Sequence, residues 1–401
     1  MKTVRLREGK ERSLQRRHPW VFQGSIDKGG GDTGETVRVE AADGSFLGWG
    51  AFSPRSQIRV RIWSFDEHER VDEALFQRRI AAALRYRQRL AIASKGQRLI
   101  HGEADGLPGL IVDRYDDTLS VQCLAAGIER WKPVIVAALV AETGCTRVYE
   151  RSDSSVRQLE GLAVKTGWLQ GAEGEAPAER TIDEHGWQLQ VDIAHGHKTG
   201  YYLDQRDNRG RFAAWVRQFG AKRVLNCYSY TGGFSVAALA GGASEVSSVD
   251  SSGPALARAQ AHVERNAAAF GYDPAAHRTL DADVNATLRQ LLKDGRRFDA
   301  IVLDPPKFAP SAAHAERAAR AYKDINRLAF KLLSPGGLLL SFSCSGGVNA
   351  DLFHKIVAGA GIDAQVDGHL LARLEAAPDH PTTVAFPEGE YLKGLAIVVK
   401  G

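Results

Sequence analysis

The pattern of apolar and polar positions changes twice along the chain. Between residues 36 and 65, short segments alternate β-branched and polar residues and are separated by the turn signals Asp43-Gly44 and Ser53-Pro54. This alternation predicts a small β-barrel. From Asp72 onward, apolar residues recur at helical spacing with a run of arginines on the opposite, solvated face, which predicts one helix of about four to five turns.

The middle of the chain mixes both periodicities. Strand-like segments return at residues 98–125, with a turn at Asp116-Asp117, and a helical pattern over 131–143 and a strand at 147–151 follow. This mixture predicts a compact α+β domain. The segment 171–186 is rich in glycine, proline and acidic residues and poor in apolar ones, which predicts a linker or an exposed hairpin.

The last part of the chain, from about Trp187, alternates apolar strands with helices. The strands are RVLNCY, EVSSVD, FDAIVLD and GLLLSFS, and the helices follow Gly233, span Pro254 to Phe270 and lie near Tyr322 to Leu333. Such alternation predicts an α/β fold with a doubly wound, mostly parallel sheet and a ligand crevice at the carboxyl ends of its strands. We therefore expect three domains, at residues 1–70, 71–185 and 186–401.

Composition excludes several classes of protein. With 401 residues, 44% hydrophobic and 25% charged, the chain resembles neither a disordered nor a collagen-like sequence. The net charge of +4 is uneven: it is +5 over residues 1–64, −4 over 65–185 and +3 over 186–401. A mild basic excess at both ends permits a polyanionic partner without demanding one.

The cysteines and the N-terminus indicate the compartment. The four cysteines are far apart and form no CxxC pair, which argues against a disulfide framework and a thiolate zinc site. His195 and His197 have no third ligand nearby, so no metal site is expected. The first twenty residues lack the apolar core of a signal peptide, and no apolar run is long enough to span a bilayer. We expect a cytoplasmic protein without membrane association.

Two strand ends carry the signals of a nucleotide-type ligand. The strand before Asn226 leads into a loop with Gly232-Gly233, where glycine lets the backbone approach a ligand; a simple helix cap is the alternative. Asp250 ends the next strand and is able to accept both hydroxyls of a ribose, or to cap the following helix. Asp283 is able to accept a hydrogen bond from an adenine amino group, or to be solvated. The fingerprint GxGxxG is absent, which disfavours hydride transfer.

The segment FDAIVLDPPKF, residues 298–308, carries the most specific signal. Its buried strand ends in Asp304-Pro305-Pro306, and two prolines fix the backbone at the crevice. Cys344 follows another buried strand, GGLLLSFS, in a polar setting between two serines. By itself such a cysteine is either a nucleophile or a structural residue.

The N-terminal region combines cations with aromatic residues, as RNA recognition requires. The cations are Arg5, Lys10, Arg12, Arg16 and Arg17, and the aromatics are Trp20 and Phe22. An exposed basic face over two core aromatics is the competing interpretation.

Together the motifs resemble a known family. HPWVFQGSI and DGSFLGWGAFSPRSQIRVR resemble an RNA-binding PUA domain. KTGYYLDQRDNR, LNCYSYTGGF, VLDPPKF, YKDIN, FSCSG and PEGEYLKG are similar to the class I S-adenosylmethionine (SAM)-dependent methyltransferases that form 5-methylcytosine in bacterial 23S ribosomal RNA, closest to those modifying cytosine 1962 of the large subunit. The resemblance runs from Leu6 to Lys400. It implies a Rossmann-like catalytic domain, SAM as cofactor, 23S rRNA as partner and a role in rRNA processing.

The resemblance also implies roles for individual residues. Cys344 is implied as the nucleophile that attacks carbon 6 of cytosine, with Asp304 at the base edge or the cofactor amine. Lys307 is implied as a phosphate contact. Glu388 is a further acid expected near the site. The expected cofactor contacts are Tyr202, Asp204, Arg206, Asn226, Tyr228, Thr231, Gly232, Gly233, Asp250, Asp283 and Asp304.

The chain departs from related RNA 5-methylcytosine enzymes at one position. Many of them carry a second cysteine after the Asp-Pro pair, whereas this chain has Pro306. The group that removes the proton from carbon 5 is therefore unassigned.

Three other functions stay open from the sequence. An amino-group methyltransferase of the same fold also uses an Asp-Pro-Pro loop, but an aromatic residue usually follows, where this chain has Lys307. A non-catalytic RNA-binding assembly factor would bind SAM without transferring its methyl group. An NAD oxidoreductase would carry the glycine fingerprint GxGxxG, which this chain lacks. The sequence also leaves open the oligomeric state, a homodimer included.

Overall fold

The computed structural model describes residues 2–171, 179–308 and 315–400. It divides the chain into two compact units, each assembled from three segments. The first unit contains Met1–Glu184, Val191–Leu203 and Pro378–Gly389, and the second contains His185–Gln190, Asp204–Ala377 and Glu390–Gly401. The first unit thus includes both of the first two domains expected from the sequence, and the boundaries at residues 70 and 185 stay a prediction.

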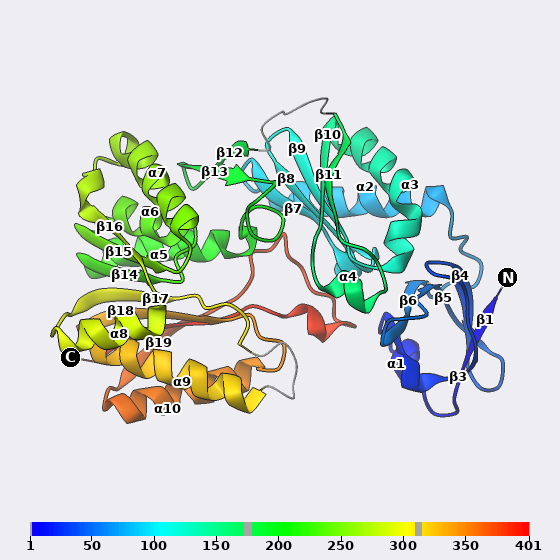
Figure 1. Ribbon diagram of the computed structural model, residues 1–401. Helices are drawn as coiled ribbons and strands as arrows, with labels where there is room; N and C mark the ends of the chain where they lie inside the picture. Colours follow the sequence, from blue (N-terminus) through cyan, green and yellow to red (C-terminus); the bar gives the residue numbers. More distant parts are fainter. Residues whose placement is uncertain (1, 172–178, 309–314, 401) are drawn as a thin grey trace. The chain divides into compact units, whose positions relative to one another are not determined.

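The N-terminal part of the first unit is a six-stranded sheet, shown in blue in Figure 1. Its strand order is β2-β6-β5-β4-β1-β3, and β1 pairs in parallel with β4 while the other described pairs are antiparallel. The elements are β1 (Thr3–Leu6), α1 (Arg12–Gln15), β2 (Trp20–Phe22), β3 (Ile26–Gly29), β4 (Thr36–Glu40), β5 (Phe46–Phe52) and β6 (Ile58–Ser64). The alternation seen in the sequence puts Val37, Val39 and Val60 in the core of this sheet.

A second, five-stranded sheet follows in the order β11-β10-β9-β8-β7, with helices α2 and α3 packed together and onto it. The elements are α2 (Glu73–Leu90), β7 (Gly96–His101), β8 (Leu110–Tyr115), β9 (Thr118–Cys123), α3 (Ala126–Thr143), β10 (Arg147–Ser152), α4 (Val156–Leu159) and β11 (Lys165–Gln170). The predicted α+β composition of this region is confirmed.

Three details of this region differ from the sequence-based expectation. Arg87, expected on the solvated face of α2, is 2% exposed and donates to the carbonyls of Arg98 and Asp379. Helix α3 begins at Ala126 rather than near residue 131. Its N-terminus is capped by a distant side chain, because the Glu160 carboxylate accepts a hydrogen bond from the Ala126 amide.

The third difference concerns the burial of the segment 171–186, which the sequence predicts to be a linker or an exposed hairpin. Residues 179–184 of that segment form strand β12 (Glu179–Glu184), in which Ile182 and Glu184 are buried. Strand β12 and β13 (Trp187–Asp192) make a two-stranded sheet. Residues 172–178, expected in the same linker, lie outside the described residues.

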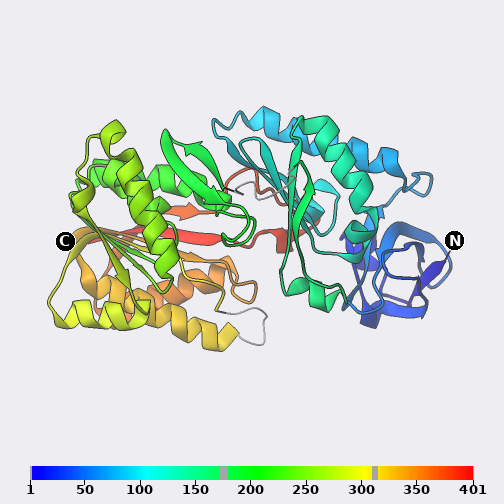
Figure 2. The ribbon, with the colours of Figure 1, turned by 45° about the horizontal axis from the view of Figure 1, so that its top comes forward.

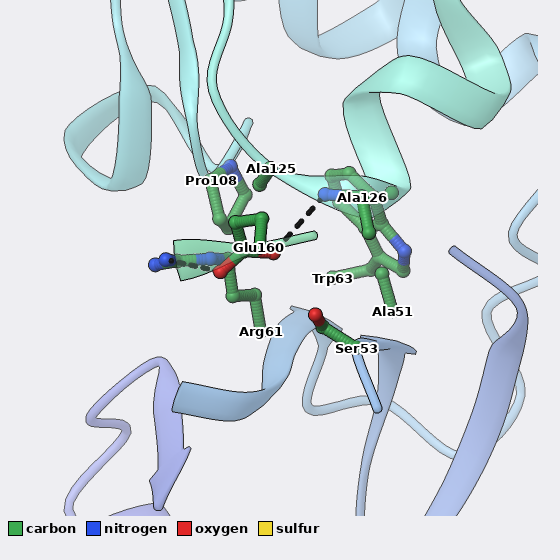
Figure 3. A pocket seen from close by; sticks show the side chains of 9 residues that line it. Ala51, Ser53, Arg61, Trp63, Pro108, Ala125, Ala126 and Glu160 are labelled. Atoms are coloured by element: carbon green, nitrogen blue, oxygen red, sulfur yellow. Dashed lines mark hydrogen bonds and ion pairs between the residues drawn. The ribbon is translucent and has the colours of Figure 1, made fainter. Parts of the chain in front are cut away.

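A small hollow lies between the N-terminal sheet and α3 within the first unit (Figure 3). Trp63 and Ala51 line it from the sheet, and Glu160 crosses it to bind both Arg61 and the Ala126 amide. The Arg61 guanidinium is also 3.1 Å from Glu103, which accepts a hydrogen bond from the Trp20 indole. None of the site residues expected from the sequence lines the hollow. The ion pairs of Arg61 instead join strand β6 to the short helical turn Gly102–Asp105 and to the end of α4.

The second unit is a seven-stranded sheet between two layers of helices (Figures 1 and 2). Helices α5, α6 and α7 cover one face, and α8, α9 and α10 cover the other. The strands are β14 (Arg223–Cys227), β15 (Glu245–Asp250), β16 (His277–Asp281), β17 (Phe298–Leu303), β18 (Leu333–Ser343), β19 (Gly368–Leu374) and β20 (Lys393–Val399). The helices are α5 (Arg206–Phe219), α6 (Gly233–Ala240), α7 (Gly253–Phe270), α8 (Val284–Lys293), α9 (Ala315–Leu332) and α10 (Ala350–Ala364).

The order of this sheet is β16-β15-β14-β17-β18-β20-β19. Strands β14 to β18 are parallel, and β20 is inserted antiparallel between β18 and β19. The predicted doubly wound, mostly parallel sheet is confirmed. The chain runs outward in opposite directions from β14 and β17, so the crevice for a ligand is expected at the carboxyl ends of these two strands.

Candidate active site

The strand order of the sheet reverses between β14 and β17, and this switch point brings two of the predicted strand ends together. Cys227 at the end of β14 pairs with Leu303 at the end of β17, so Asn226 lies on β14 next to the strand that Asp304 directly follows. Parallel pairing across buried strands fixes this arrangement, because a slip of one residue would move every side chain of a strand to the opposite face of the sheet and disrupt its packing against the helices.

The loop after β14 is tightly wound. Tyr228, Tyr230 and Gly232 have φ angles of 58°, 47° and 77°, and the Ser229 amide donates to the carbonyl of Val249 at 3.1 Å. A Cβ atom at Gly232 would lie 2.7 Å from the Cβ of Ala259 on α7. Glycine at 232 is therefore required both by the backbone conformation and by the close packing of α7.

The loop presents polar atoms that have no protein partner among the described residues. Asn226 donates from Nδ2 to Ser235 Oγ at 2.9 Å, which leaves its buried Oδ1 without a partner. The hydroxyls of Ser229 and Thr231 are also buried without a hydrogen bond. Buried polar atoms are normally satisfied, so this concentration indicates a surface that a polar ligand completes.

Asp250 connects this loop to the next strand end. One carboxylate oxygen accepts from the Tyr230 amide at 2.8 Å and the other from the Ser252 amide at 3.0 Å. The helix-capping role is taken by Ser252, whose hydroxyl accepts from the Ala255 amide. Each carboxylate oxygen has a second lone pair, so Asp250 is still able to accept hydroxyl groups from a ligand.

Asp304, which follows β17, and Asp204 form a pair of carboxyl groups. Gln205 donates to Asp304 at 3.0 Å, and the Tyr391 hydroxyl donates to one oxygen of Asp204 at 2.7 Å. The second oxygen of Asp204 is buried without a partner among the described residues. Burial, together with the Asp204 carboxylate, raises the pKa of Asp304 from 3.8 to about 7. Two carboxyl groups this close to one another favour a ligand that brings positive charge or N–H donors.

Cys344 directly follows β18, and β18 is the strand next to β17. Its Sγ lies 4.0 Å from the Pro305 carbonyl oxygen in the Asp304-Pro305-Pro306 segment. Of the four cysteines, Cys344 alone is not buried. Burial raises the pKa of the Cys123 thiol to about 12 and raises that of Cys227 still further. A thiol with a raised pKa is a weak nucleophile, so the geometry favours Cys344 as the reactive cysteine.

Comparison with known proteins agrees with this geometry. A model described as S-adenosylmethionine-dependent methyltransferase matches residues 161–393, and one described as a PUA-like domain matches residues 4–65. The chain belongs to the SAM-dependent methyltransferase family. The predicted PUA-like module, methyltransferase fold and SAM cofactor are thereby confirmed.

Curated relatives match over nearly their whole length. The protein named ribosomal RNA large subunit methyltransferase I of Aliivibrio fischeri (strain MJ11) is 47% identical over 398 residues, 98% of each chain. The protein of the same name from Photobacterium profundum is 47% identical over 404 residues, 99% of each chain.

Solved structures support the fold. A putative SAM-dependent methyltransferase from Streptococcus mutans is 23% identical, covers 99% of this chain and 100% of its own, and has a TM-score of 0.84. A second solved chain, a putative methyltransferase complexed with SAH, is also 23% identical, with a TM-score of 0.85 and the same coverage.

The residues at the switch point fit SAM. Its amino-acid end offers an ammonium and a carboxylate, which match the free oxygen of Asp204 and the hydroxyls of Ser229 and Thr231. Its ribose hydroxyls match the remaining lone pairs of Asp250. The individual contacts stay predictions.

The other predicted cofactor contacts have different surroundings. Arg206 begins α5 and is 3% exposed, with Nε 3.3 Å from Asp207. Asp283 caps α8, because its side chain accepts from the Ala286 amide at 2.8 Å. Tyr202 belongs to the Val191–Leu203 segment of the first unit, where its hydroxyl lies 3.4 Å from His197. Gly233 is the first residue of α6.

The predicted RNA contacts divide into two kinds. Lys10, Arg12, Arg16 and Arg17 are exposed, and Lys307 is exposed in the loop after β17. Arg5 instead forms an ion pair with Glu40 at 2.9 Å, which lowers the pKa of that carboxyl. Its charge is therefore balanced within the sheet. None of the described helices combines the length and apolar composition that crossing a membrane requires.

Sequence reasoning missed three residues of the site: Gln205, Tyr391 and Lys393. The last two stand in PEGEYLKG, a motif in which only Glu388 is expected from the sequence to be near the site. Glu388 lies in the first unit, where its carboxylate is 3.3 Å from the His18 ring. Tyr391 and Lys393 belong to the second unit with Asp204 and Cys344, and attention to every polar residue of the motif would have found them.

Proposed function

We propose that this chain transfers the methyl group of SAM to carbon 5 of a cytosine in 23S ribosomal RNA, with Cys344 as the nucleophile. The observation that carries the proposal is the position of Cys344: it is the one accessible cysteine and lies beside the Asp304-Pro305-Pro306 segment. The names of the full-length relatives support rRNA of the large subunit as the substrate class. Work on rRNA implies a cytoplasmic enzyme, which is part of the same proposal.

The chemistry requires a cysteine because carbon 5 of cytosine is a poor nucleophile. Attack of the Cys344 thiolate on carbon 6 forms a C–S bond and makes carbon 5 electron-rich. SAM, when bound, supplies the electrophilic methyl group. After transfer, a base removes the proton from carbon 5, and the C–S bond breaks to release the thiolate and restore the aromatic ring.

Asp304 is the candidate for proton transfer at this site. Its pKa of about 7 is close to the operating pH, where a carboxyl group is able both to accept and to release a proton. Gln205 fixes one carboxyl oxygen, which leaves the other to take part in proton transfer beside the segment that Cys344 touches. Asp304 thus fills the role left unassigned by the proline at 306.

The decisive experiment uses an rRNA fragment that contains 5-fluorocytosine at the target position. Fluorine replaces the proton that must leave before elimination, so the wild-type chain is expected to form a stable covalent adduct. Mass spectrometry should locate the adduct on Cys344. Cys344→Ser should bind SAM and RNA but lose turnover, because a serine hydroxyl without a dedicated base is a far weaker nucleophile.

Cys145→Ser is the matched control, since that cysteine is buried in the first unit. It should form the adduct and methylate RNA like the wild type. An adduct on Cys227, or full turnover by Cys344→Ser, would make the nucleophile assignment wrong. An N-methylated product would overturn the reaction class.

A further inference from the structure

Lys393 lies beside the backbone around Cys344. It is the first residue of β20, which pairs antiparallel with β18, and its register partner is Ser343, the residue before Cys344. The Lys393 ammonium donates to the carbonyl oxygen of Ser345 at 2.9 Å. The lysine therefore engages the residues on both sides of the cysteine.

The surroundings of this ammonium favour interaction with an anion. Among the described residues, no carboxylate forms an ion pair with Lys393. Burial lowers the pKa of Lys393, a negative charge on Cys344 raises it, and the Lys307 ammonium lowers it. Because the interaction of two charged groups is reciprocal, the Lys393 ammonium favours the negatively charged form of Cys344.

Three further titratable groups lie near this segment: Tyr322, Lys307 and Asp304, which precedes the Pro305 carbonyl that faces Cys344. The buried Tyr322 hydroxyl is 2.9 Å from Ser345 Oγ, and the pKa of Tyr322 is raised chiefly by burial, so it is uncharged near neutral pH. Lys307 is exposed and its field is weakened by water, whereas Lys393 is partly buried. Of these two cations, Lys393 is the one whose charge acts through the less polar medium.

We propose that Lys393 is a positioning residue for the reaction: its ammonium fixes the Cys344–Ser345 backbone and stabilises the thiolate form of Cys344. The step involves only proton loss, in which the Cys344 thiol releases its proton to solvent and the anion remains beside the ammonium. The inference rests on the proposed function for its place in catalysis, but the thiolate itself is measurable without RNA or SAM.

The test is the pH profile of alkylation of Cys344 by iodoacetamide, followed by peptide mass spectrometry of the full chain. Iodoacetamide is uncharged, so removing a lysine does not change its attraction to the site. The rate follows the thiolate fraction. We expect Lys393→Met to move the midpoint upward by about one pH unit or more, which corresponds to roughly tenfold slower alkylation below both midpoints.

Two further variants separate charge from architecture. Lys393→Arg retains the cation and should keep the midpoint near that of the wild type and recover methylation partly. Lys355→Met is the matched control, because Lys355 is an exposed lysine of α10 that pairs with Asp351 in the same unit. It should leave both the midpoint and the methylation rate unchanged.

An unchanged midpoint in Lys393→Met would overturn the proposal. So would an equal upward shift in Lys393→Met and Lys393→Arg, since the lysine would then only shape the loop. The proposed function fails separately, if Cys344→Ser methylates RNA at the wild-type rate. That result leaves the alkylation profile of the lysine variants unaffected, so the two failures are distinguishable.

Discussion

At the scale of single residues, Asp250 combines loop order with the predicted contact to ribose. Its two oxygens accept from the amides of Tyr230 and Ser252. We expect Asp250→Ala to weaken SAM binding by about 1.5–3 kcal/mol, because charge-assisted hydrogen bonds are lost. Asp281→Ala is the control, since Asp281 is the exposed register partner of Asp250 on β16. Titration calorimetry that gives wild-type affinity for Asp250→Ala would refute the assignment.

The raised pKa of Asp304 predicts that the stability of the folded chain depends on pH. Its pKa is about 7 in the folded chain and has its ordinary value, 3.8, when unfolded, so protonation favours the native state. The resulting stabilisation is present below pH 3.8 and is lost as the pH rises to about 7. Asp304→Asn carries no charge and still accepts from Gln205.

We therefore expect the melting temperature of SAM-free Asp304→Asn to exceed that of the wild type by an amount that grows from pH 3.8 to about pH 7 and is then constant. Thermal denaturation at several pH values measures this difference. Activity should fall while stability rises, as is common when a functional group is buried at a cost. A difference that is the same at every pH would show that the carboxyl has no raised pKa.

At the scale of elements, helix α6 is flanked by two glycines with positive φ that differ in their surroundings. Gly232 has a φ of 77° and faces Ala259 of α7, whereas Gly242 has a φ of 101° and open space around it. Alanine costs roughly 1–2 kcal/mol in strain at either position, and at Gly232 overpacking adds about 1–3 kcal/mol.

We expect Gly232→Ala to be less stable than Gly242→Ala by at least about 1 kcal/mol in urea unfolding, and to bind SAM more weakly. Gly242→Ala should retain the SAM affinity of the wild type, because that glycine follows the far end of the helix. If both variants lost the same unfolding free energy, the contact of Gly232 with α7 would not affect stability.

At the scale of the whole molecule, the predicted RNA contacts require a test that keeps the chain intact. Arg61 and Trp20 bind Glu103, and Arg61 also binds Glu160. Deleting the first 70 residues would remove both partners and leave these carboxylates unpaired, which destabilises a protein strongly. Substitution of exposed cations is the cleaner experiment.

We define the N-terminal basic group as Lys10, Arg12, Arg16 and Arg17. Replacing all four with glutamine should weaken binding to an rRNA fragment and reduce the slope of log affinity against log salt by up to about 3.6, because each phosphate contact contributes roughly 0.7–0.9. SAM affinity should be unchanged. Fluorescence anisotropy over a salt series measures the effect.

The control replaces four cations of the second unit that are accessible to solvent and already paired with carboxylates. They are Arg278, Arg320, Lys323 and Lys355. The control should keep the RNA affinity and the salt dependence of the wild type. If its RNA affinity and its salt slope fall as much as those of the variant of the N-terminal basic group, RNA binding does not depend on that group.

Local structure and much of the candidate site could be predicted from the order of residues alone. Apolar periodicity predicted the βα alternation, and the residues that follow strands, Asp250, Asp304 and Cys344, were identified because parallel strands end at one edge of a sheet. Apolar periodicity gave a wrong prediction where a residue distant in the sequence decides where a helix begins or whether a side chain is buried. Glu160 caps the first turn of α3, and backbone carbonyls hold Arg87 inside the first unit.

Which groups act on one another depended on the packing of the whole chain. Asp204 and Asp304 are far apart in the sequence, yet the Asp204 carboxylate helps to raise the pKa of Asp304. Lys393 reaches the residue after Cys344 because β20 is inserted between β18 and β19. Hydrophobic patterns specify which side of an element is buried, whereas charge coupling depends on distance and on the removal of water, and these quantities exist only once the strands have paired.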